Sequence, residues 1–343
     1  MYYLRFQFLA KFICCTLLLF VSSSSFAKQQ VVPPNPEREA AIKLLEAGKN
    51  AEAVQAFRHY LSNPQNSKDA EVWLYFGVAQ YRNNELEAAK DTLKKAVKLN
   101  PGSDIAHSKY AAVLYDLRKF NDAEKESGQA VKLNPNNSEA VYLQGLVFYG
   151  KGECAKAIAN ADAIMKLNPQ FAQSYMLKAQ ALIGFVMAKG GGEQKEFPVS
   201  WKKAFFESAS LIEKYIELKP SGIDTEFWHE RLNALRYYAG DKSSLGCISS
   251  ITDPGVVGPQ ILYKEKARYT DEARNYGIHG TIRIKAIFDA DGRVKHVLAV
   301  TFLPGGLTNE AIKAAQKIQF QPATLNGKPV CTSLIMEFSF ELL

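Results

Sequence analysis

The middle of the chain repeats its pattern of small and apolar residues every 34 residues. The tripeptide Leu-Asn-Pro occurs at 99–101, 133–135 and 167–169, so successive copies are 34 residues apart. An alanine stands twelve residues before each proline, and a glycine or alanine stands twenty-four before it. Small residues let two antiparallel helices approach closely, and proline ends the second helix because it cannot continue the helical hydrogen bonding. A fixed period of this length predicts an all-α solenoid of helix pairs.

This pattern resembles the tetratricopeptide repeat. The segment 70–103 fits best, and the residues at the family's positions are Trp73, Phe76, Gly77, Ala89, Leu93, Ala96 and Pro101. The resemblance implies full repeats at 70–103, 104–137 and 138–171, and a degenerate first copy at 34–69. A fifth copy is interrupted by an inserted loop near 184–200, and a capping helix follows it. The predicted solenoid of about five repeats therefore covers residues 34–240.

The same resemblance implies a concave surface lined by the first helix of each repeat. Carried onto this chain, the peptide-binding positions are apolar or tyrosine: Leu74, Val78, Tyr81, Tyr115, Tyr142, Leu146, Tyr149 and Met176. Such side chains suit an extended peptide segment, through ring packing and hydroxyl hydrogen bonds. The tyrosines can equally pack one repeat on the next, and the sequence leaves both interpretations open.

After Gly240 the helical period stops, and a segment with frequent proline and glycine at 241–258 is predicted to be a linker. We then expect a helix at 267–276, two strands around the turn 289–292, a helix at 308–319 capped by Thr308, and a last strand at 330–340. One face of the first strand carries Ile282, Ile284, Ala286 and Phe288. One face of the second carries Val294, His296, Leu298, Val300 and Phe302. This second period predicts a small α+β domain.

Residues 254–343 resemble the C-terminal domain of the TonB family, a periplasmic module that contacts outer-membrane receptors. The resemblance is carried by Ala273-Arg274, Gly277 to Gly280, Asp291-Gly292-x-Val294, Leu307 to Ala315, Phe320-Gln321-Pro322-Ala323 and Asn326-Gly327-Lys328-Pro329-Val330. The chain departs from the family at Thr270 and Ile318, where proline and tryptophan are usual. The predicted fold is an all-α TPR solenoid followed by a small α+β TonB C-terminal-like domain at 259–343.

The last predicted strand alternates between two faces. The side chains expected to face the helices are Leu334, Met336, Phe338 and Phe340. The TonB resemblance implies that a partner's extended segment adds to this strand, because an edge strand offers unpaired N–H and C=O groups. The predicted docking residues are Ser333, Ile335, Glu337 and Ser339. Homodimerisation through the same edge is the alternative.

The first 27 residues have the pattern of a secretory signal peptide. Arg5 and Lys11 accompany an apolar run at 12–21, and Ser25-Phe26-Ala27 places small residues at a cleavage site. The run is shorter than the ~20 residues that a membrane span needs. We therefore expect cleavage before Lys28 and a location in the periplasm of a Gram-negative bacterium. An uncleaved segment would instead anchor the chain in the inner membrane.

Composition and motifs limit the kinds of partner and activity that we expect of this chain. The 343 residues carry 42 Lys+Arg against 35 Asp+Glu, a net charge of +7 without a dense basic stripe, so no nucleic-acid partner is expected. The five histidines are dispersed and no catalytic motif occurs, so we expect no enzymatic activity, metal, cofactor or small-molecule substrate. Cys247 and Cys331 could be bridged in an oxidising compartment, with Cys331 on the polar face of the last strand.

These observations indicate a non-enzymatic periplasmic adaptor for protein partners. Its groove would bind extended peptide segments, and its TonB-like domain would dock an envelope or outer-membrane partner by strand addition. The alternative is a TonB-type energy-transducer component for transport through outer-membrane receptors. The TonB resemblance implies that an energy transducer has a histidine on its membrane anchor and a long proline-rich arm. Here the first 27 residues contain no histidine, and repeats replace the arm. The residues for harvesting a proton gradient are therefore not in this sequence.

Overall fold

A computed structural model describes residues 35–188, 197–219, 225–240, 247, 254–275, 278–303 and 305–341. From Pro36 onward these residues belong to one compact unit. The predicted signal peptide, most of the predicted linker, residues 189–196 of the predicted inserted loop, and Gly277 lie outside the described residues. The loop predicted at 184–200 is shorter than expected, because helices continue to Ala188 and begin again at Val199.

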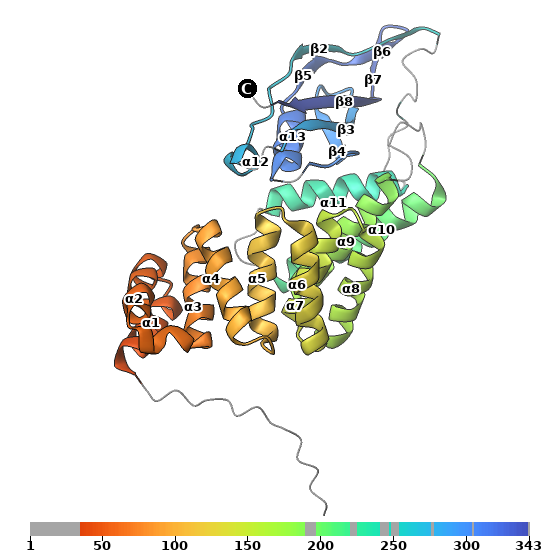
Figure 1. Ribbon diagram of the computed structural model, residues 1–343. Helices are drawn as coiled ribbons and strands as arrows, with labels where there is room; N and C mark the ends of the chain where they lie inside the picture. The colour runs from red at the N-terminus through yellow and green to blue at the C-terminus, as the bar shows by residue number, and fades with distance from the viewer. Residues whose placement is uncertain are drawn as a thin grey trace, which may run out of the picture. The chain divides into compact units, whose positions relative to one another are not determined.

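The described chain begins with helices that pack against each other in consecutive pairs (Figure 1). Their bounds are α1 Pro36–Glu46, α2 Asn50–Ser62, α3 Ala70–Arg82, α4 Leu86–Leu99, α5 Asp104–Asp116, α6 Phe120–Leu133, α7 Ser138–Gly150, α8 Cys154–Leu167, α9 Ala172–Ala188, α10 Val199–Leu218 and α11 Thr225–Ala239, with a 3-10 turn at Pro64–Lys68. Helices α3, α5 and α7 begin at the first residue of each predicted full repeat. The predicted helix pairs are confirmed.

The 34-residue period extends to the N-cap residues, which stand just before the helices. Asp69, Ser103 and Asn137 precede α3, α5 and α7, and each side chain accepts a hydrogen bond from a first-turn backbone N–H at 3.0 to 3.2 Å. The asparagine of each Leu-Asn-Pro accepts a bond from the backbone N–H two residues later. These bonds satisfy groups that helix ends and turns otherwise leave unpaired.

Two glycines of the repeat are needed for close helix packing. A Cβ on Gly77 would stand 2.5 Å from Cγ of Leu93, and a Cβ on Gly145 would stand 2.6 Å from Cδ2 of Leu177. Both leucines are almost fully buried. Glycine at these positions therefore makes room for a buried leucine of a neighbouring helix.

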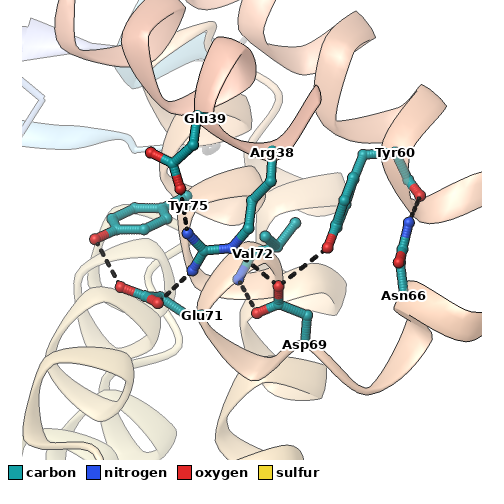
Figure 2. Close-up of polar contacts among 8 residues, drawn as sticks. All are labelled: Arg38, Glu39, Tyr60, Asn66, Asp69, Glu71, Val72 and Tyr75. Carbon is teal, nitrogen blue, oxygen red and sulfur yellow. Dashed lines mark hydrogen bonds and ion pairs between the residues drawn. The ribbon is translucent and has the colours of Figure 1, made fainter. Parts of the chain in front are cut away.

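Asp69 joins the first three helices (Figure 2). Its carboxylate accepts bonds from Val72 N–H at 3.0 Å, from Arg38 Nε at 3.1 Å and from the Tyr60 hydroxyl at 3.4 Å. Arg38 also pairs with the exposed carboxylates of Glu39 and Glu71. Because Asp69 is only 8% exposed, these donors replace the water that its charge would otherwise require.

The rest of the described chain consists of short antiparallel sheets with two helices. The elements are β1 Val256–Val257, β2 Gln260–Tyr263, α12 Asp271–Asn275, β3 Gly280–Phe288, β4 Val294–Ala299, α13 Leu307–Gln316, β5 Gln319–Gln321, β6 Ala323–Leu325, β7 Lys328–Val330 and β8 Thr332–Phe340. The sheets have the strand orders β4-β3-β8, β1-β6-β7 and β2-β5. Apolar residues of α13 pack with those of β3 and β8 in a single core. The predicted α+β fold is confirmed.

Both predicted helices of this domain are shorter than expected. The helix predicted at 267–276 is only α12, because the Thr270 hydroxyl caps it by accepting a bond from Ala273 N–H at 3.1 Å. The helix predicted at 308–319 spans Leu307–Gln316, and Gly306 rather than Thr308 stands at its N-cap. The Thr308 hydroxyl instead bonds both backbone groups of Leu303.

The predicted last strand and the predicted linker also differ from the structure. The strand at 330–340 is divided into β7 and β8, which pair with different neighbours, β6 and β3. Cys331 lies between them and is buried, not on an exposed polar face, because its sulfur is bonded to Cys247. The end of the predicted linker forms β1, paired with β6.

A bulge in β4 overturns the predicted face of the second strand. His296 has a left-handed backbone, with φ of 50°, and the pairing of β3 with β4 shifts register beside it. One extra residue in a strand moves the following side chains to the opposite face. Val294, Val297 and Ala299 therefore pack toward α13, whereas Leu298 and Val300 join a core cluster with α9, α10 and α11.

Helix α11 packs on this outer face of β4. Leu232 and Leu235 share a core cluster with Leu298 and Val300. The Tyr237 ring stacks on the His296 ring, with centroids 4.2 Å apart and planes at 10°. The apolar core of the helical part is thus continuous with one face of the β4-β3-β8 sheet.

Two further contacts connect the helical part to the sheets. Lys285 of β3 is buried, and its Nζ lies 4.6 Å from the centre of the Phe197 ring. This is a cation–π distance. Cys247 is joined to Cys331 by a disulfide with a Cα–Cα distance of 4.7 Å.

We expect Asp69→Ala to lower the free energy of unfolding by roughly 2 kcal/mol, because it removes a helix cap and leaves Arg38 without its buried partner. Urea unfolding followed by circular dichroism would measure the loss. Asp69→Asn keeps a capping oxygen and should lose less. Glu39→Ala removes an exposed partner of Arg38 and should change stability little. Equal losses in all three variants would contradict the role given to Asp69.

We expect the stability of the fold to decrease as the pH falls below about 6.5. Burial and the nearby Lys295 lower the pKa of His296 below its usual value, and Nδ1 of its ring has no hydrogen-bond partner in the described structure. The folded state therefore keeps His296 neutral, while the unfolded chain takes up a proton near pH 6.5. The stability is complete above that pH and is lost as the pH falls toward the folded pKa.

The pH effect can be measured by urea unfolding at pH 7.5 and 5.5 in the wild type and in His296→Asn. Asparagine tolerates the left-handed backbone but does not titrate. The variant should show a smaller difference between the two pH values, even if it is less stable throughout. The same difference in both proteins would show that His296 is not the group responsible.

Candidate peptide-binding groove and docking strand

The eight predicted groove residues all lie on the first helices of the repeats, α3, α5, α7 and α9. Leu74 is buried in a core cluster, and Val78 and Tyr81 pack against the same cluster. Tyr142, Leu146 and Tyr149 pack against the core formed with α8 and α9. Each of these side chains therefore contributes to packing between repeats, whatever else it binds.

The tyrosines of the groove are held by specific contacts. The Tyr81 hydroxyl donates to Oδ2 of Asp116 at 2.5 Å. The rings of Tyr142 and Phe171 pack in a T-shaped arrangement, with their centroids 5.4 Å apart. Burial raises the pKa of Tyr142 and of Tyr149 to about 12. Both hydroxyls therefore keep their protons at neutral pH and can act only as neutral hydrogen-bonding groups.

Tyr115, Tyr149 and Met176 line a cavity of about 660 Å³ with residues from beyond the repeats. Among these are Trp228 and Arg231 of α11 and Phe302 after β4. The structure thus brings together three of the eight predicted groove residues. The other five do not line this cavity.

Sequence reasoning did not find Trp228, Arg231 or Phe302 as site residues. Trp228 and Arg231 lie on the predicted capping helix, which follows the last 34-residue period, and Phe302 was placed on a strand. No repeat position specifies where such a helix contacts the groove. The available sign of a site in the sequence was that Arg231 and Trp228 are neighbours on the surface of a helix otherwise expected to cover apolar residues.

Strand β8 is an edge strand of the β4-β3-β8 sheet. The Val300 N–H donates to the Arg283 carbonyl at 2.7 Å, and the Arg283 N–H donates to Oγ1 of Thr301 at 2.7 Å. The backbone groups of Arg283 in β3 therefore point away from β8. In an antiparallel pair, the opposite residue Glu337 then points its own backbone groups out of the sheet. Accordingly, Lys264 Nζ donates to the Glu337 carbonyl at 2.5 Å.

The backbone N–H and C=O groups of all four predicted docking residues point outward, because every second residue of a strand directs these groups to the same side. They are Ser333, Ile335, Glu337 and Ser339. The side chains of Glu337 and Ser339 are exposed, and those of Ser333 and Ile335 are half-buried. Phe338 and Phe340 are buried in the core with α13, and Leu334 and Met336 pack against it. The edge thus offers main-chain groups while the opposite side chains hold the strand in place.

Strand β2 presents a second apolar edge that sequence reasoning missed. Ile261, Leu262 and Tyr263 are 43%, 57% and 55% exposed, and β2 pairs only with β5 in the described structure. The four-residue strand is too short to show a clear alternation, so the sequence predicted no element at 260–263.

The described residues contain no group of three or more His, Cys, Asp or Glu side chains placed to hold a metal ion. Within the same ranges, none of the helices has the length and apolar character needed to cross a membrane. Cys154 is a free, buried thiol, and burial raises its pKa.

Comparison with protein families identifies both parts of the chain. Residues 265–342 match the family described as Gram-negative bacterial TonB protein C-terminal. Residues 44–113 and 111–170 match two families of tetratricopeptide repeats. Both kinds of domain are non-catalytic and of the adaptor type.

Solved structures similar to this chain include several repeat proteins. A MamA protein is 21% identical, with a TM-score of 0.42, and the match covers 54% of this chain and 90% of that one. YrrB, a TPR protein with an unusual peptide-binding site, is 18% identical, with a TM-score of 0.41 and coverage of 55% and 87%. A repeat protein from Parabacteroides merdae is 16% identical, with a TM-score of 0.45 and coverage of 60% and 73%.

A comparison with curated proteins found no match. The family matches agree with the helix pairs and with the antiparallel sheets described above. The protein therefore carries tetratricopeptide repeats of a protein–protein interaction adaptor, followed by a TonB C-terminal domain that suggests a partner in the cell envelope.

Proposed function

We propose that this protein is a non-enzymatic periplasmic adaptor that docks an envelope or outer-membrane protein by strand addition to β8. The observation that carries the proposal is the outer side of β8, which pairs with no other strand of the described residues and where alternate residues direct their N–H and C=O groups away from the sheet. A partner strand would displace the Lys264 side chain from the Glu337 carbonyl. A partner strand there would gain main-chain hydrogen bonds with little demand on its side chains.

The periplasmic location is supported by two separate observations. The first 27 residues have the pattern of a cleaved signal peptide. The disulfide between Cys247 and Cys331 suits an oxidising compartment.

The groove of the repeats is the second binding surface of the proposed adaptor. Leu146 and Val78 are half-buried on the first helices of their repeats. A partly exposed apolar position can bury further area against an extended segment. The proposed partner segment is therefore apolar and extended.

We expect Ser333→Pro to reduce partner binding more than Ser333→Ala. Proline removes the outward N–H of residue 333, while both variants lack the hydroxyl. The full chain can be produced with a photo-crosslinking residue beside β8, and the yield of crosslinked partner measured in the periplasmic fraction. Circular dichroism should show both variants folded. Equal yields from the two variants would exclude β8 as the docking strand.

We expect Leu146→Glu to reduce capture of extended apolar peptides at least several-fold, with Leu146→Ala intermediate, because a charge on the groove opposes apolar contact. Leu133→Glu is the matched control, since Leu133 is exposed on α6 and is not a predicted groove position. Binding to an immobilised peptide library would measure capture. If the Leu146 variants bind as the wild type does, this position serves only to pack the repeats.

A further inference from the structure

The cavity beside α11 has the size and lining of a small-molecule site. Its volume of about 660 Å³ falls within the range of roughly 300–1,000 Å³ that is usual for such sites. Most of its wall is apolar, and Met176, Trp228 and Phe302 come from three separate segments of the chain. Helices α5, α7 and α9, helix α11, and the segment after β4 surround it.

The charged side chains that line the cavity are all cationic. Arg118 and Arg231 line it, and no carboxylate does so among the described residues. Burial lowers the pKa of Arg231, and its guanidinium lies 5.8 Å from the Trp228 ring. No described carboxylate forms an ion pair with Arg231. Arg231 is half-buried, and a carboxylate or phosphate matches the geometry of its guanidinium.

The N-terminus of α13 reaches the same cavity. Gly306, Thr308 and Asn309 line it, and Gly306 stands at the N-cap with no side-chain hydrogen bond. The first turn of a helix carries a partial positive charge and favours an anion. Glu310 in this turn pairs with Lys313 and does not line the cavity. The helix end therefore adds to the positive potential of the two arginines.

We infer that this cavity binds a small amphiphile, with one carboxylate or phosphate at Arg231 and an apolar body along Met176, Trp228 and Phe302. The volume of the cavity suits a small molecule. The inference goes beyond the proposed function, because the ligand is not a protein segment and the site is not the β8 edge.

Calorimetric titration of the full chain tests the inference, with each probe kept below the concentration at which it forms micelles. Dodecanoate and dodecyl phosphate supply the two possible anions, and dodecanol has the same apolar chain without a charge. At least one anionic probe should bind about tenfold more tightly than dodecanol, as expected for a hydrogen-bonded charge. Absence of binding by both anions, or equal binding by dodecanol, would overturn the inference.

Arg231→Gln should weaken binding of the anionic probe about tenfold and leave dodecanol binding unchanged. Arg236→Gln is the matched control on the same helix, because the Arg236 side chain is 46% exposed and pairs with Glu213. It should bind as the wild type does. Wild-type affinity in Arg231→Gln would assign the cavity no anion-binding role. Ser333→Pro should also bind normally, which separates this site from the docking strand.

Protection of Cys154 provides a test that needs no variant. Its thiol lines the cavity, so a bound anionic probe should slow its alkylation by iodoacetamide at least several-fold. Peptide mapping by mass spectrometry separates Cys154 from the other cysteines. Dodecanol at the same concentration should protect less. An unchanged alkylation rate with saturating dodecanoate and dodecyl phosphate would reject binding in this cavity.

Discussion

The packing of α11 on β4 determines how the repeats and the sheets share one structure. The bulge at His296 turns Leu298 and Val300 outward, and Leu232 and Leu235 cover them. Without this bulge, the same strand would direct the alternate set of side chains toward the helix. Strands β4 and β8 are the two end strands of this sheet, and the segment after β4 lines the cavity.

The sequence alone predicted the features that depend on local spacing. The 34-residue period indicated the helix pairs, because each copy repeats a proline, an alanine and a small residue. The caps Asp69, Ser103 and Asn137 follow the same period and were available to the same reasoning. Gly77 and Gly145 were correctly interpreted as sites of close approach, since the neighbouring leucines leave no room for a side chain.

Features that depend on tertiary contacts could not be predicted in this way. The alternation at 294–302 contained no sign that His296 would adopt a left-handed backbone, because the stacking partner Tyr237 comes from a distant helix. Similarly, Thr308 is a normal capping residue by type, and only its bonds to Leu303 show a different role. Three of the eight predicted groove residues line the cavity, but Trp228, Arg231 and Phe302, which also line it, lie outside the repeats.

The disulfide has a mechanical consequence for a protein that is gripped at β8. Cys331 immediately precedes β8, and Cys247 lies 84 residues earlier, shortly after α11. Tension applied by a partner at the start of β8 would pass through two sulfur atoms to the end of the helical part. The intervening strands would lie outside this covalent path, so the small sheets could be deformed by a load without breaking the connection between the repeats and the gripped strand.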